Sequence, residues 1–293
     1  LAQRVSSASG RSKLTEALML AVASCEDLEE PRKVQLLHGI MEQVTAAWHA
    51  CDLVQSGNPQ TLLETIKSAI NTGGAPSIFA WGPMEDNQPG LGKLKDVRTM
   101  LSTFSALSQT QRGALETTSL ADAIVTEWAP GIFRLLQALC HLYVFAAGSD
   151  DQTLRVLVLI PCRTEIEAMT GRAVSSEEEE DLAKQFSGGI DPRLAAAIRS
   201  VLYEFRSLAA KAAKACLTFK SFWALPTCSQ WLKDTAESLR AVRPHVAELL
   251  LREIFLPLVR NQNHLNDATV AGVSQIFMPT LLSSTSFLLK EFW

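Results

Sequence analysis

The stretch Pro31–Gln55 (PRKVQLLHGIMEQVTAAWHACDLVQ) decides the fold, because its apolar residues form two helical seams instead of one. The first seam contains Val34, Leu37, Met41, Val44 and Trp48, and the second contains Leu36, Ile40, Ala47 and Cys51. A helix on the surface of a domain needs one apolar stripe, so a helix with two must be covered on two sides. Stacked helical arrays impose that demand, since each helix packs on its own partner and on neighbouring pairs. The stretch therefore predicts a superhelical scaffold.

The composition predicts a folded chain without a membrane-spanning segment. Of its 293 residues, 47% are hydrophobic and 20% are charged, so there is enough apolar surface to offset chain entropy. No run reaches the roughly 18 uninterrupted apolar residues that cross a bilayer, and we expect no membrane insertion. The net charge of −4 argues against a general nucleic-acid binder. Because the chain opens at Leu1 and closes on Phe292 and Trp293 within an apolar pattern, we expect a fragment of a longer protein.

No motif of a catalytic, metal or nucleotide site stands out. The six cysteines form no C-x-x-C pair, and the five histidines lack metal-ligand spacing. The run Gly90–Lys93 resembles a phosphate-binding loop, but Asn87 and Leu94 occupy the places of its first Gly and its Ser or Thr. We therefore expect no metal, no cofactor and no enzymatic activity. Scattered cysteines also suit a reducing compartment.

Helical periodicity extends over nearly the whole chain and predicts an all-α protein. The predicted helices cover about residues 14–25, 31–55, 59–71, 91–109, 119–147, 152–169, 192–223, 226–240, 242–259 and 266–293. Two interruptions separate them, a Gly- and Pro-rich inter-helix loop at 72–92 and an acidic loop at 171–191. About five antiparallel helix pairs of HEAT size result, so we expect one continuous α-solenoid over residues 1–293.

Two blocks of sequence resemble the exportin-5-like branch of the importin-β (karyopherin) superfamily. The first block is L-x-E-A-L-x-L at Leu14–Leu20, followed by Pro31-Arg32-Lys33. The second block comprises Leu239–Pro244 (LRAVRP), Phe255–Val259 (FLPLV) and Phe277–Leu282 (FMPTLL). In that family the corresponding order is a helix entered through Arg-Pro, a Pro-Leu-Val exit and a helix whose centre reads apolar-Pro-x-Leu.

This resemblance implies a nuclear export receptor built from HEAT repeats, with this chain covering middle-to-late repeats. Such a receptor binds RNA or protein cargo together with Ran in its GTP form, contacts nuclear pore proteins and shuttles between nucleus and cytoplasm. The main Ran contact would lie in repeats outside this chain. The alternative is a HEAT-repeat scaffold of a stable complex, without Ran dependence.

One basic helix face is a candidate cargo surface. Between residues 193 and 220 there are six basic residues and one acid, a local charge of 6 − 1 = +5. Four of the basic residues fall within roughly 60° of one direction at about 100° per residue, and these are Arg199, Arg206, Lys214 and Lys220. The functional interpretation is a stripe that holds phosphates. The alternative is an ordinary polar face neutralised by other helices.

Further candidate cargo residues stand at the start of the two-seamed helix. Arg32 and Lys33 occupy that start, and the resemblance implies cargo contacts from such helix-start basic residues. Thr72, in the following turn, is a third candidate. The alternative for Arg32 is an exposed salt bridge with Glu29 or Glu30.

An acidic run at Glu177–Asp181 lies in the second interruption. We expect a solvated loop there. Ser175 and Ser176 directly precede the run, so the segment could also accept phosphate or act as a lid over a basic surface.

Overall fold

The computed structural model describes residues 14–71, 94–104, 119–181, 192–260 and 268–292, apart from positions 16, 20, 23, 95, 176, 179 and 180. Within these ranges every regular element is a helix, which confirms the all-α class. The predicted loop at 72–92, with Thr72, lies outside the described residues.

The described helices follow one another along the whole chain. The first are α2 (Glu30–Ala50), α3 (Asp52–Ser56) and α4 (Pro59–Asn71). The middle ones are α6 (Ser119–Ala147), α7 (Gln152–Leu159), α8 (Arg163–Thr170) and α10 (Pro192–Cys216). The last are α11 (Lys220–Ala224), α12 (Cys228–Ser238), α13 (Pro244–Leu250), η3 (Leu251–Phe255), α14 (Leu256–Arg260) and α16 (Ala268–Phe292). The described residues within 14–24 and 94–104 are also helical.

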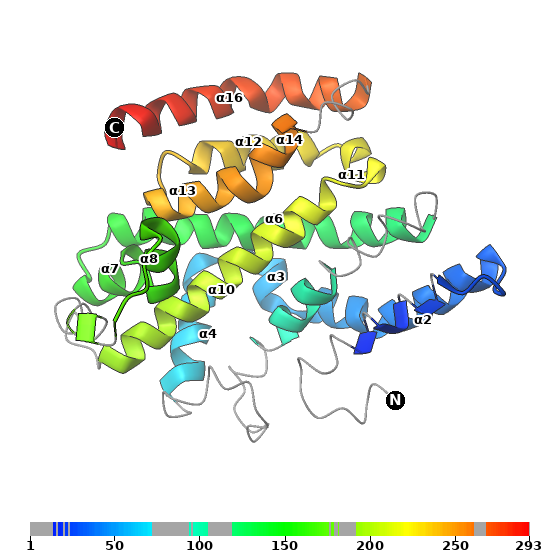
Figure 1. The fold of residues 1–293 in the computed structure, drawn as a ribbon, viewed down its shortest axis with the longest axis horizontal. Coiled ribbons are helices and arrows are strands. Elements are labelled where there is room, and N and C mark those ends of the chain that lie inside the picture. Colours follow the sequence, from blue (N-terminus) through cyan, green and yellow to red (C-terminus); the bar gives the residue numbers. More distant parts are fainter. Residues whose placement is uncertain are drawn as a thin grey trace.

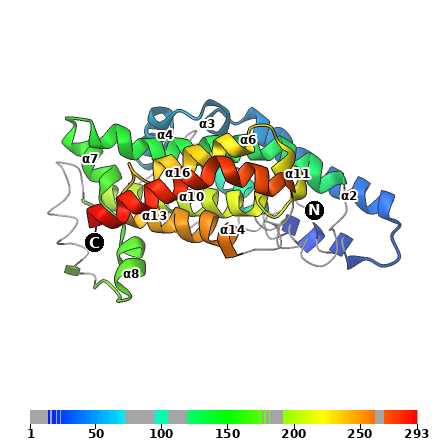
Figure 2. The same ribbon diagram turned by 90° about the horizontal axis from the view of Figure 1, so that it is seen from above.

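The longer helices from α6 onward stack in two columns (Figure 1). We call α6, α12 and α16 the back column, because α12 packs on α6 and α16 packs on α12. The front column consists of α10 and the continuous helix α13–η3–α14, whose segments α13 and η3 pack on α10. Seen from above, α16 lies over this stack with its axis roughly along α12 and α13 (Figure 2). Along the chain, the members of the stack (α6, α10, α12, α13–η3–α14 and α16) therefore alternate between the back column and the front column.

The two seams of α2 are buried to different degrees. Leu37, Met41 and Trp48 of the first seam are buried, whereas Leu36 and Ile40 of the second are only half-buried. The helix also ends earlier than predicted. Its next residue has an extended backbone, and the short helix α3 follows. Among the described residues, the core therefore rests on one seam of α2 and the second is partly covered.

A stacked aromatic pair joins α2 to α6 at the centre of the core. The rings of Trp48 and Trp128 lie 4.9 Å apart at an interplanar angle of 5°. Phe104 also stacks on Trp128, with ring centroids 5.4 Å apart. Gly131 allows this close approach, because a Cβ atom there would lie 2.5 Å from Val54 and 2.8 Å from the Trp48 ring. A glycine in the middle of a long helix is thus explained by packing.

Prolines shape the helices that we predicted to be continuous. The predicted helix 152–169 is two helices, because Pro161 has no N–H to donate and forces Ile160 into an extended backbone. Ahead of Pro257 the front helix widens into the π-helical turn η3, where the N–H of Leu256 donates to the carbonyl of Leu251. The wider turn relieves the clash that a proline ring makes with the carbonyl four residues earlier. The predicted helix 192–223 also ends early, at Cys216.

Among the described residues, one stretch, Val125–Ala147 of α6, has the length and apolar composition to cross a membrane. It is 67% buried inside the protein. Its contacts on several sides account for this composition, because α3, α10, α11 and α12 all pack on α6.

Candidate functional site

The structure places two residues of the predicted basic stripe inside the protein. The side chains of Arg199 and Arg206 are buried, with 6% and 4% of their surfaces exposed. On that face Arg206 meets Glu165 of α8 and the Tyr143 ring of α6, and Arg199 lines a small cavity together with residues of α8. The prediction of an exposed stripe is therefore wrong for these two residues, because periodicity identifies a shared helix face but not what packs against it.

Arg206 belongs to a buried polar cluster. Its guanidinium forms an ion pair with Glu165, and both side chains are 5% exposed. The other carboxylate oxygen of Glu165 accepts a hydrogen bond of 2.9 Å from the N–H of Cys162, at the start of α8. The guanidinium also lies over the ring of Tyr143, 5.3 Å from its centroid. One carboxylate thus joins α8 to α10, and the arginine extends the link to α6.

His245 of α13 completes this cluster. Its Nε2 atom lies 3.8 Å from Glu165 Oε1, and its ring meets that of Tyr143 edge-on at 6.1 Å. Burial lowers the pKa of His245 from 6.5 to about 4, although Glu165 opposes the shift. The histidine is therefore neutral at pH 7, and the cluster carries one positive and one negative charge.

The chemistry available to this cluster is limited. Burial raises the pKa values of Cys140 and Cys162 to about 12, so both thiols stay protonated and are poor nucleophiles. The cavity beside Cys162 and Arg199 has a volume of about 30 Å³, room for about one water molecule. These features describe a structural junction between four helices.

The remaining members of the stripe lie further along α10 and at the start of α11. Lys214 is 41% exposed and donates to Glu253 of η3 at 3.2 Å. Burial pushes the pKa of Glu253 upward, but hydrogen bonds from Arg252 and Lys214 outweigh it and hold this pKa below its ordinary value. The side chain of Lys220 lies outside the described part of the structure. For Lys214, the alternative of a face neutralised by other helices fits the geometry.

The basic residues at the start of α2 lie at the surface. Arg32 is exposed and Lys33 is half-buried. The side chain of Arg32 donates to Gln35, one turn along the same helix. A partner on the same helix leaves the guanidinium at the surface, so Arg32 is an accessible member of the predicted cargo residues.

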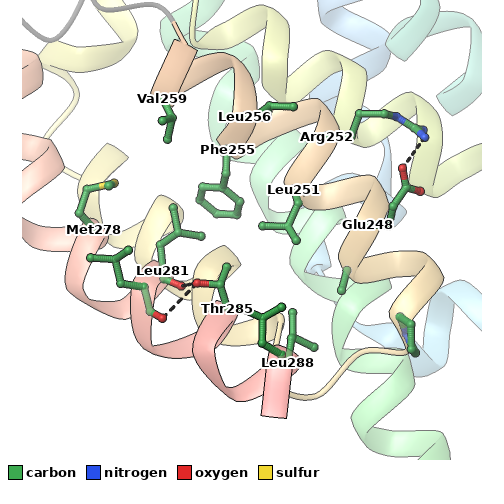
Figure 3. A pocket seen from close by; sticks show the side chains of 14 residues that line it. Glu248, Leu251, Arg252, Phe255, Leu256, Val259, Met278, Leu281, Thr285 and Leu288 are labelled. Atoms are coloured by element: carbon green, nitrogen blue, oxygen red, sulfur yellow. Dashed lines mark hydrogen bonds and ion pairs between the residues drawn. The ribbon is translucent and has the colours of Figure 1, made fainter. Parts of the chain in front are cut away.

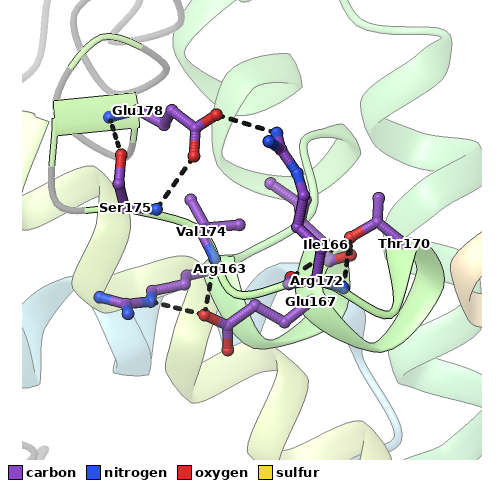
Figure 4. Close-up of polar contacts among 8 residues, drawn as sticks. All are labelled: Arg163, Ile166, Glu167, Thr170, Arg172, Val174, Ser175 and Glu178. Atoms are coloured by element: carbon purple, nitrogen blue, oxygen red, sulfur yellow. Dashed lines mark hydrogen bonds and ion pairs between the residues drawn. The ribbon is translucent and has the colours of Figure 1, made fainter.

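The acidic run begins as a helix instead of a loop (Figure 4). The Oγ atom of Ser175 accepts from the N–H of Glu178 at 3.1 Å, and the Glu178 carboxylate accepts from the N–H of Ser175 at 3.0 Å. This reciprocal pair is a capping box, which stabilises a helix start. Arg172 adds an ion pair to Glu178 at 2.8 Å. The prediction of a loop is therefore wrong at 177, 178 and 181, and residues 182–191 lie outside the description.

Sequence reasoning missed an apolar groove between the front helix and α16 (Figure 3). Its volume is about 820 Å³. Leu251, Phe255 and Val259 line it from one side, and Met278 and Leu281 line it from the other. The signal was present in α16, whose apolar residues occupy more of the helix surface than one buried face requires. Among the described side chains, no group of three or more metal-ligating residues is found.

Comparison of the chain with known proteins finds no matching family model, no matching curated protein and no matching solved structure.

Proposed function

We propose that this chain is part of a nuclear export receptor of the karyopherin type, a HEAT-repeat solenoid that binds RNA or protein cargo together with RanGTP. The observation that carries the proposal is the alternation of successive helices between two columns, which is how paired helical repeats stack. The second exportin-like block falls on these helices. Arg243 is the N-cap of α13, Pro244 opens that helix, and Pro279 lies inside α16.

The proposed mechanism is binding without covalent chemistry. Small rotations between stacked repeats add up to a large change in the curvature of a solenoid. Cargo and RanGTP would each favour one curvature, so each would raise the affinity for the other. GTP hydrolysis in the cytoplasm would release both, after passage through the pore along nuclear pore proteins. The receptor would therefore shuttle between nucleus and cytoplasm.

The test compares the nucleotide states of Ran. The full-length protein that contains this chain is immobilised and exposed to nuclear extract, RNA included, with Ran locked in its GTP form or loaded with GDP. We expect a defined cargo to be retained only with the GTP form. Retention favoured by the GDP form would indicate an importer. Retention that does not depend on Ran would remove the transport proposal.

A second candidate is a HEAT-type scaffold within a stable complex, and the apolar groove favours it. A fixed complex uses apolar interfaces, whereas a receptor that releases its cargo presents a more polar surface. A stable partner that copurifies with the protein, and stays bound whichever nucleotide Ran carries, would establish this alternative.

A further inference from the structure

The buried cluster around Glu165 contains polar atoms that the protein alone leaves without a hydrogen bond. Among the described residues, the hydroxyl of Tyr143, Nε of Arg206 and Nε2 of His245 are buried and have no hydrogen-bond partner. These three side chains are 1%, 4% and 7% exposed. In folded proteins, the large majority of buried side-chain polar atoms bond to another protein group or to ordered water. Three exceptions within one cluster therefore point to a shared partner.

The distance between His245 and Glu165 suits a partner with a single heavy atom. Nε2 of His245 lies 3.8 Å from Oε1 of Glu165, beyond the range of about 2.7–3.2 Å for a direct N–H···O bond. Two polar atoms at this separation can both bond to a third atom placed to one side of the line between them. Oε1 also accepts from Arg206, and a carboxylate oxygen has a second lone pair for another donor. A single small molecule can therefore bridge α13 and α8.

The protonation states of the cluster decide what this partner must do. Burial lowers the pKa of His245 to about 4, so the imidazole is neutral and has one N–H and one acceptor nitrogen. Burial raises the pKa of Tyr143, so its hydroxyl keeps the proton and can donate or accept. Nε of Arg206 only donates, and Oε1 of Glu165 only accepts. The partner must therefore accept hydrogen bonds as well as donate them.

The charge of the cluster favours a neutral partner. Arg206 and Glu165 carry one positive and one negative charge and form an ion pair. An added anion would lie beside the Glu165 carboxylate and an added cation beside the guanidinium, so either would leave an unbalanced charge in the interior. An anion also cannot donate to Oε1, and a metal cation cannot accept from Nε. Water is neutral, donates and accepts, and buried water in proteins bonds to about three such groups.

We propose that the junction of α6, α8, α10 and α13 is a binding site for internal water, in which one molecule bridges His245 Nε2 and Glu165 Oε1. The hydroxyl of Tyr143 bonds to this molecule or to a second one beside it. The bridge supplies a hydrogen-bonded link from α13 to α8 and satisfies polar groups whose burial would otherwise be costly. The inference holds whether or not the chain is an export receptor, because these side chains lie in the interior of the described structure.

Oxygen-17 relaxation dispersion of the solvent tests the proposal, because it detects water molecules that stay inside a protein for longer than its tumbling time. The double variant Tyr143→Phe, His245→Leu removes polar groups while keeping side chains of similar size. We expect its dispersion amplitude to fall, relative to the wild type, by the contribution of at least one water molecule. Equal amplitudes in the wild type and the folded double variant would overturn the proposal.

Tyr203→Phe is the matched control, because it removes the hydroxyl of the chain's other tyrosine, which is half-buried on α10. We expect its dispersion amplitude to equal that of the wild type. A loss as large as that of the double variant would contradict the proposal, since the signal would not depend on the cluster. Should the double variant lose its helical circular dichroism, Tyr143→Phe alone replaces it, and we expect a smaller loss.

The stability of Tyr143→Phe is an independent readout, because the substitution removes only the hydroxyl and keeps the ring that contacts Arg206 and His245. Losing a hydroxyl that bonds to water should lower the urea midpoint of unfolding, whereas losing an unpaired buried hydroxyl should raise it. We expect a lower midpoint. A midpoint that rises or stays the same would mean that the hydroxyl has no water partner, against the proposal.

A crystal structure of the protein would locate the bridging molecule. We expect a water oxygen within hydrogen-bond distance of both His245 Nε2 and Glu165 Oε1. A direct bond between these two atoms, or an ion in the place of the water, would show that the proposal is wrong.

Discussion

At the scale of single residues, the packing of the interior leaves little room for added atoms or for a lost polar contact. Gly131 faces the Trp48 ring across a gap that admits no side chain, and Glu165 holds groups from neighbouring helices on its two oxygens. Both residues lie where helices meet. Their roles are therefore structural, and stability measurements can test them.

Substituting alanine for Gly131 should destabilise the protein. The added Cβ would lie within 2.5 Å of Val54, so helix α6 or the Trp48 ring must move. We expect a loss of about 1–3 kcal/mol in the free energy of unfolding, typical of an overpacked core. Gly39→Ala is the control, because nothing lies within 4 Å of its Cβ position. That change should stabilise helix α2 by about 0.5–1 kcal/mol in urea unfolding. Equal effects at the two sites would contradict the packing argument.

Acid should weaken the fold through His245. Its pKa in the folded protein is about 4, and in the unfolded chain it is near 6.5. Below pH 6.5 the unfolded chain binds a proton that the folded protein refuses, so stability falls as the pH drops from 6.5 to 4. The loss contributed by this residue reaches up to about 3 kcal/mol.

The variant His245→Gln should lack this contribution, so its unfolding free energy should depend less on pH between 6.5 and 4 than that of the wild type. Glu165 and Arg206 face the same site and remain in both proteins. Replacing the exposed His38 by Gln should leave the wild-type dependence in place. Parallel pH profiles for all three proteins would exclude His245 as the source.

At the scale of helices, the junction of α8, α10 and α13 decides what the basic residues of α10 do. A basic helix face is expected to meet water or a polyanion. Here two of its arginines lie inside the protein, one of them paired with Glu165. At these two positions the positive charges of α10 therefore lie inside the protein, where they contribute to contacts between helices and do not face solvent.

Removing Arg206 alone should be costly. Arg206→Met leaves the Glu165 carboxylate buried without its partner, and we expect a loss of about 3–5 kcal/mol in unfolding free energy. The double variant Arg206→Met, Glu165→Met should lose less than the sum of the two single variants, because it leaves no buried charge unpaired. A double-mutant cycle in urea measures this coupling. Strictly additive losses would mean that the two side chains do not interact.

At the scale of the whole molecule, exposed cations lie on several helices, among them Arg32 of α2, Arg163 of α8 and Arg260 of α14. Arg32 lies at the start of α2, on the early part of the chain, and the apolar groove lies at α16, on the late part. The proposed cargo contact is tested through Arg32, since Arg199 and Arg206 are buried.

If Arg32 contacts RNA, Arg32→Glu should weaken binding of a short RNA hairpin in the presence of RanGTP. It should also lower the slope of log affinity against log salt by about 1, because one phosphate contact is lost. Arg260→Glu makes the same charge change at an exposed position of α14 and serves as the control. The same salt slope in both variants would remove Arg32 from the cargo surface.

Local patterns in the sequence determined the class and most of the elements. The periodicity of apolar residues predicted an all-α chain, and the ranges 59–71 and 119–147 agree with α4 and α6. Periodicity succeeds there because a helix must bury one face wherever it packs. Helix breaks were less predictable. The break at Pro161 follows from its missing N–H, whereas the end of α2 before Cys51 has no such local signal.

Only the tertiary structure decided which faces are covered. Arg199 and Arg206 do share one face of α10, but their burial depends on helices such as α6 and α8, which lie elsewhere in the sequence. The groove likewise arises because the front helix and α16 lie side by side with no helix between them among the described residues. The apolar pattern of a helix shows which of its residues favour burial. Whether another helix covers those residues depends on contacts between segments that are distant in the sequence.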